Sequence, residues 1–87
     1  MTKLTLSKPI QAHGAEISEL DISEPTGKDV RELGFPYKHY VDGSIQFLAD
    51  KTAAYLVRLS KIPMSSVDQM SPADINNASM VLSNFFQ

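Results

Sequence analysis

The sequence has only 87 residues and contains no cysteine, and this absence limits how so small a chain can be stabilised. A domain of this size buries a smaller share of its surface than a large one, and its core contributes only about 3–5 kcal/mol net. Disulfides, a structural metal or self-association usually add support. Without Cys, disulfides, thiolate zinc sites and a cysteine nucleophile are all excluded. We therefore expect a single small domain over residues 1–87 that self-associates as a homo-oligomer.

The charge balance and the N-terminal sequence narrow the classes of partner. Eight basic residues stand against ten acidic ones, giving a net charge of -2. Nucleic-acid binding depends on a basic patch that neutralises phosphates, so we expect no nucleic-acid partner. The N-terminal stretch MTKLTLSKPI has no apolar run of secretory length, and no other segment is long and apolar enough for a membrane span. We expect no membrane partner and a location in the cytoplasm.

Alternating apolar residues near the N-terminus predict a β-hairpin with strands near 3–10 and 16–22. Leu4 and Leu6 are separated by polar residues, as in a half-buried strand. His13-Gly14 favours a turn between the strands, because Gly adopts positive φ at little cost. A lone hairpin is only marginally stable in water, so helices or another copy must cover its apolar face.

Three helical segments are predicted after this hairpin. Thr26 and Asp29 have the spacing of a capping box for a short helix that Gly34 ends. The longest helix is predicted over 44–61, and a third begins at Ser71-Pro72. The core stripe of the longest helix comprises Ile45, Leu48, Ala49, Thr52, Leu56 and Leu59. The intervening stretch 35–43 is predicted as a loop held by Phe35, Tyr37 or Tyr40.

These elements predict an α+β fold, an N-terminal β-hairpin followed by about three helices in a single small domain. The expected core comprises Leu6, Leu20, Ile22, Leu33, Leu48, Leu56, Leu59, Ile75, Leu82 and Phe85.

No constellation of residues in the sequence indicates catalysis or metal binding. His13 and His39 lack a metal-ligand spacing, and we assign both to ordinary surface or loop roles. No serine lies in a G-x-S-x-G motif. The acidic residues Glu16, Glu19, Asp21 and Glu24 could bind a cation or act as an acid–base pair, but a solvated strand edge is favoured. The sequence therefore predicts no catalytic residue, no metal, no cofactor and no enzymatic activity.

Exposed apolar side chains are the remaining candidates for function. On the predicted helix 44–61, Phe47 lies opposite the core stripe, although the loop 37–41 could fold over it. Phe85 and Phe86 lie on the apolar face of the last helix, and we expect them to pack into the core of the domain, although they could remain partly exposed. The predicted partner-binding residues are Phe47, Lys51, Ala54, Arg58, Phe85 and Phe86.

The order of several motifs resembles a known protein family. The motifs are LTLSKPI, EISELDISEPTGKDVREL and LVRLSKIPMSSVDQMSPADINNASMVLSNFF. The EPTG-x-D step at 24–29 and the run from Leu59 to Asp74 are the most specific. In these motifs, from about Leu4 to Phe86, the chain resembles the small tail assembly chaperones of contractile-tailed bacteriophages of the Mu and P2 type.

The resemblance implies a phage- or prophage-encoded morphogenesis factor in the bacterial host cytoplasm, without catalytic activity. Such a factor holds the tape measure protein soluble while the tail tube polymerises around it, and is often also made as a longer frameshifted form. Two alternatives remain. One is a small regulatory or scaffold module that acts by oligomerisation, such as an antitoxin-like or structural subunit. The other is an accessory domain of an enzyme. A gene for a tail tube protein upstream and one for a tape measure protein downstream would favour the chaperone.

Overall fold

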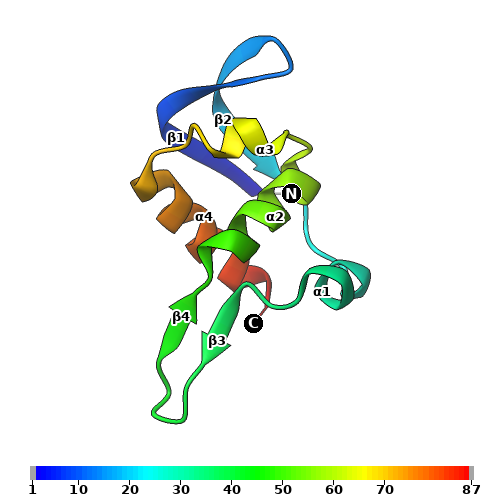
Figure 1. Cartoon of the computed structure of the whole chain (residues 1–87), viewed down its shortest axis with the longest axis vertical. Coiled ribbons are helices and arrows are strands. Elements are labelled where there is room, and N and C mark those ends of the chain that lie inside the picture. Colours follow the sequence, from blue (N-terminus) through cyan, green and yellow to red (C-terminus); the bar gives the residue numbers. More distant parts are fainter. Residues whose placement is uncertain (1, 87) are drawn as a thin grey trace.

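The elements run from an N-terminal hairpin to a C-terminal helix and include a second, smaller hairpin (Figure 1). The computed structural model describes residues 2–86. In chain order the elements are β1 (Thr2–Ala12), β2 (Ala15–Ile22), α1 (Gly27–Leu33), β3 (Tyr37–His39), β4 (Ile45–Phe47), α2 (Ala49–Ser60), α3 (Met64–Val67) and α4 (Pro72–Phe85). The predicted fold class, an α+β domain that begins with a hairpin and continues into helices, is confirmed.

Strands β1 and β2 form the predicted antiparallel hairpin, with Leu4 opposite Leu20. The turn between them contains His13 and Gly14, whose φ values are 53° and 78°. Positive φ at both central residues is what a two-residue type I′ turn requires, and this turn matches the twist of the flanking strands. The His-Gly pair therefore forms the tight turn that the sequence predicts.

A bulge of several residues interrupts β1 around Pro9. Residues 5–10 of β1 face only three residues of β2. Pro has no N–H for the ladder, and a bulge is one of the few places in a sheet that accepts it. The N–H of Ser7 donates to both carboxylate oxygens of Asp74 at 2.9 Å, and the N–H of Lys8 donates at 3.3 Å. The bulge thus ties the sheet to α4.

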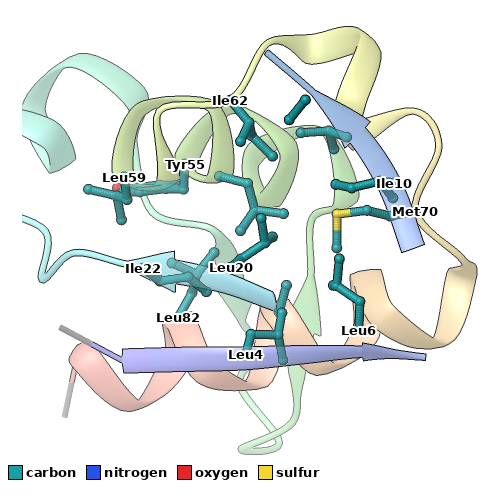
Figure 2. Packing of buried hydrophobic residues seen from close by; sticks show 14 residues of the cluster. Leu4, Leu6, Ile10, Leu20, Ile22, Tyr55, Leu59, Ile62, Met70 and Leu82 are labelled. Carbon is teal, nitrogen blue, oxygen red and sulfur yellow. The ribbon is translucent and has the colours of Figure 1, made fainter. Parts of the chain in front are cut away.

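The core lies between the β1–β2 sheet and the helices α2 and α4 (Figure 2). β1 lies against α4, whereas β2 lies against α2. The buried apolar residues are Leu4, Leu6, Ile10, Ala12, Leu20, Ile22, Tyr55, Leu56, Leu59, Ile62, Val67, Met70, Ala78 and Leu82. Burial is confirmed for six of the expected core residues, Leu6, Leu20, Ile22, Leu56, Leu59 and Leu82. The sheet thereby gains the cover that a lone hairpin needs.

Four expected core residues are less buried than predicted. Leu33, Ile75 and Phe85 are half-buried and pack against the edge of the core. Leu48 is half-buried because it is the N-cap of α2 rather than an interior residue of a helix.

The predicted helix ends of α1 and α4 are confirmed. The Thr26 N–H donates to the Asp29 carboxylate at 2.8 Å and the Thr26 hydroxyl accepts from the Asp29 N–H at 3.4 Å, forming the capping box. Gly34 follows α1 with φ 78°, which favours glycine. At the start of α4, the Ser71 hydroxyl accepts from the N–H of Asp74 at 3.2 Å.

The predicted helix over 44–61 is wrong in its first turn, and the predicted loop over 35–43 is wrong in part. Helix α2 begins only at Ala49, and the residues before it form β4, which pairs with β3. Asp42-Gly43 is a strong hairpin turn signal, and Ile45 and Phe47 alternate with polar residues at the period of a strand. This local preference prevails over the helical pattern, and Ile45 is 51% exposed rather than part of a core stripe.

Candidate partner-binding surface

The β3–β4 hairpin projects from the body of the molecule, away from the β1–β2 sheet (Figure 1). At its base, the N–H of Leu48 donates to the carbonyl of Pro36 at 2.9 Å. The hydroxyl of Tyr55, on α2, donates to the carbonyl of Gly34 at 2.5 Å. This hydrogen bond attaches the segment that precedes β3 to α2. The hairpin is therefore held at its root by a buried side chain of the core.

The tip of the hairpin is a turn stabilised by Asp42. The N–H of Tyr40 donates to the carbonyl of Ser44 at 2.9 Å. The Asp42 carboxylate accepts from the hydroxyl of Ser44 at 2.7 Å and from its N–H at 2.9 Å. These two hydrogen bonds, with the hydroxyl donor having the larger effect, hold the pKa of Asp42 below its usual range. Gly43 has φ 91°, a conformation that favours glycine.

Four side chains share one face of this hairpin. Tyr37 lies opposite Phe47, and His39 lies opposite Ile45. Directly opposed residues of an antiparallel pair point to the same side of the sheet, as do alternate residues of one strand. We call this surface the hairpin face, defined by Tyr37, His39, Ile45 and Phe47. The ring of His39 packs edge-on against that of Tyr37, with centroids 4.9 Å apart.

An aromatic cluster connects the hairpin face to the end of α4. The ring of Phe86 lies 5.8 Å from the rings of both Phe35 and Tyr37, and 5.9 Å from that of Tyr55. All three contacts are edge-to-face, a favoured geometry for aromatic pairs. Tyr37 thus lies between Phe86 and Phe47, two residues that the sequence placed on different helices.

The opposite side of the hairpin is polar. Lys38, Tyr40 and Gln46 alternate with the residues of the hairpin face, and the Tyr40 hydroxyl donates to the side-chain carbonyl oxygen of Gln46. The hairpin is therefore amphipathic, with one side apolar and aromatic and the other hydrogen-bonded and charged.

The structure does not gather the predicted partner-binding residues on one helix face. Phe47 lies on β4, 37% exposed, so its predicted place on the central helix is wrong. Lys51 extends its ammonium group towards Gly34, and Ala54 is half-buried on α2. Phe85 is half-buried against the core.

Arg58 is engaged within the molecule. Its guanidinium lies 3.1 Å from the carboxylate of Asp29 and 2.6 Å from that of Glu32, joining α2 to α1. The pKa of Asp29 is lowered, first by the hydrogen bond from the Thr26 backbone and then by Arg58. Helix α1 contains no buried residue, so this contact is part of what holds it to the body.

Sequence reasoning missed Phe35, Tyr37 and Ile45 as members of the exposed apolar surface. The signal was present in the Asp42-Gly43 pair between two stretches of period-two aromatic and β-branched residues. Interpreting 44–48 as the start of a helix concealed it.

The His and acidic residues that the sequence offered as possible polar sites form no binding centre in the part of the chain that the structure describes. His13 Nε2 is 2.8 Å from the carbonyl oxygen of Lys61, and the ammonium of Lys3 is 3.7 Å from the Glu19 carboxylate. Within residues 2–86, His, Asp and Glu side chains form no group of three or more with the geometry of a metal site. None of the helices described is both long and apolar enough to cross a membrane.

These features define a small α+β domain whose exposed apolar side chains gather on a projecting hairpin, the kind of surface that marks interaction sites. The chain matches the family of phage tail assembly chaperone proteins, E, or 41 or 14, over residues 3–87. It therefore belongs to this family, which confirms the resemblance found in its motifs. No curated protein and no solved structure matches the chain.

Proposed function

We propose that the chain is a tail assembly chaperone that binds the tape measure protein and keeps it soluble during tail morphogenesis. Membership of the chaperone family over residues 3–87 is the observation that carries this proposal. The hairpin face supports it, because a chaperone that holds an aggregation-prone chain needs exposed apolar groups of its own.

The proposal includes the setting in which the chaperone acts. It works in the cytoplasm of the bacterial host, for a phage or prophage with a contractile tail, and it acts by binding rather than by catalysis. It functions as a homo-oligomer, and a longer frameshifted form of the same chain takes part in assembly.

Co-expression with the tape measure protein of the same phage tests the proposal. We expect the chain to raise the soluble yield of the tape measure protein several-fold and to co-purify with it. The same tape measure protein expressed alone is the control for its intrinsic solubility. If co-expression leaves the soluble yield unchanged and no complex survives purification, the proposed function is wrong.

A further inference from the structure

We infer that the hairpin face, with Phe86 at its base, is the surface that docks the client, and that it takes a single amphipathic helical segment. This inference rests on the proposed function, since it identifies the binding site of that chaperone and the chemistry of the segment bound.

The distribution of exposed apolar side chains points to the hairpin. Of the seven large apolar side chains exposed within residues 2–86, five lie between positions 35 and 47. Ile45 and Phe47 belong to the hairpin face and Phe35 contacts Phe86 at its base, whereas Tyr40 and Val41 lie on the polar side and in the turn. The other two of the seven, Met64 and Met80, lie on separate helices, α3 and α4. Single exposed apolar residues are normal on protein surfaces, whereas a contiguous group marks an interaction site.

The hairpin face is held ready for binding. At the base of the hairpin, the Tyr55 hydroxyl donates a hydrogen bond to the Gly34 carbonyl. At the tip, the Asp42 carboxylate accepts hydrogen bonds from the N–H and hydroxyl of Ser44. The edge-to-face contact of Tyr37 with Phe86 orients the face relative to α4. A surface held in this way loses little conformational entropy when a partner binds, which favours affinity.

The exposed area favours a segment over a second copy of the domain. About half of each of the Phe35 and Ile45 side chains and about a third of Phe47 are exposed. With half-buried Tyr37 and Phe86, the apolar area is roughly 300–400 Å², because an aromatic side chain offers on the order of 200 Å² in total. A stable dimer of globular proteins buries about 800 Å² on each partner, roughly twice this area.

The dimensions and charge of the face favour a helix as the occupant. Each strand has three residues, so the face is about 10 Å long, close to the 10–12 Å diameter of one helix. No carboxylate, lysine or arginine lies on it, because Lys38 points to the opposite side and Asp42 lies in the turn. Apolar residues at i, i+3, i+4 and i+7 of a client helix would cover such a face.

Titration of the full ¹⁵N-labelled chain with overlapping peptides of about 20 residues from the tape measure protein tests the inference. We expect at least one peptide to bind, to gain helical circular dichroism, and to shift the amide resonances of Tyr37, His39, Ile45, Phe47 and Phe86. Shifts confined to other elements would overturn the inference while leaving the proposed function intact.

Two variants with matched exposure sharpen the test. Ile45 is 51% exposed on the hairpin face, and Met80 is 50% exposed on α4. We expect Ile45→Ser to weaken peptide binding roughly tenfold, as truncation of an interface anchor does, and Met80→Ser to leave it unchanged. Unchanged thermal unfolding midpoints for both variants would show that folding is not the cause. Equal effects of the two substitutions would contradict the inference.

The remaining outcomes separate this inference from its alternatives. A bound peptide that becomes extended and shifts only the outer strand edges would indicate strand addition and overturn the helix docking. Ile45→Ser that turns an oligomer into a monomer without weakening peptide binding would show that the face joins two copies. If no peptide binds and co-expression does not raise the soluble yield, both the proposed function and this inference are wrong.

Discussion

At the scale of single residues, Asp74 joins two parts of the chain that lie far apart in sequence. Asp74 is only 1% exposed, and its carboxylate accepts hydrogen bonds from the N–H groups of Ser7 and Lys8, which the bulge of β1 releases from the ladder. Burial alone raises the pKa of Asp74, but the donors of Ser7, Ser71 and Lys8 favour the charged form more strongly. The pKa of this carboxyl therefore lies below its usual range.

This arrangement predicts a pH-dependent contribution of Asp74 to stability. The folded-state pKa lies below the unfolded-state value of about 3.9, so the stabilisation is complete well above that pH and is lost as the pH falls through the folded-state pKa. We expect Asp74→Asn to lower the free energy of unfolding by about 1–3 kcal/mol at pH 7, because an amide N–H₂ then opposes a buried backbone donor.

Urea denaturation of both proteins from pH 7 down to pH 2 measures this effect. The difference in unfolding free energy should shrink below about pH 4, since only the wild type loses a charged carboxylate at this site. Asp29 and Asp42, whose pKa values are also lowered, are present in both proteins and do not affect the comparison. A difference that stays constant with pH would show that ionised Asp74 does not supply the stabilisation.

At the scale of elements, the β3–β4 hairpin depends on its turn. Gly43 has φ 91°, a conformation that costs other residues about 1–2 kcal/mol. We expect Gly43→Ala to loosen the hairpin, so that the amides of Tyr40 and Leu48, which donate across it, exchange hydrogen faster. Native-state hydrogen exchange by NMR provides the measurement.

Gly27→Ala is the matched control for that substitution. Gly27 is in the first turn of α1, does not have a positive φ, and has no atom within 4 Å of the position that a Cβ would occupy. Alanine is favoured there by up to about 1 kcal/mol because of its helix propensity. Faster exchange of the hairpin amides in Gly27→Ala as well would show that the loosening does not arise from the turn.

The β1–β2 hairpin was predicted and the β3–β4 hairpin was not, because their sequence signals differ in clarity. Strands of the first hairpin have alternating apolar residues on both sides of a Gly-containing turn, and no helical pattern competes with them. The second hairpin has strands of only three residues. Its β4 precedes an amphipathic helix directly, and Ile45 and Leu48 fit the helical period. The Asp42-Gly43 turn, which pairs β4 with β3, decided for the strand.

At the scale of the whole molecule, the projecting hairpin gives the domain principal extents of 43 × 26 × 20 Å. The β1–β2 sheet has two strands within residues 2–86, and the backbone of β1 is hydrogen-bonded to Asp74, Gln69 and Ser66, so the outer edge of β2 is the one that another copy could extend. We expect sedimentation equilibrium over a broad concentration range to show species larger than 9.6 kDa, and Ile45→Ser to leave them in place. A strict monomer at high concentration would contradict the homo-oligomer.

The features that depend on neighbouring residues follow from the local sequence. These are the first hairpin with its His13-Gly14 turn, the capping box of α1, the N-cap of α4 and the apolar stripe around Leu56. Each arises from a local rule of backbone geometry, hydrogen bonding or periodicity, so a short window of sequence contains the information.

Tertiary structure decided which apolar residues stay exposed and which of them meet. Phe47 and Phe86 are distant in the sequence, but Tyr37 lies between them because β3 pairs with β4 and packs on the end of α4. Arg58, a predicted partner-binding residue, forms ion pairs with carboxylates of α1. Asp74, expected only as part of a helix start, also binds the bulge of β1. Contacts of this kind depend on how segments far apart in the sequence pack together, so they cannot be predicted from a local pattern of residues.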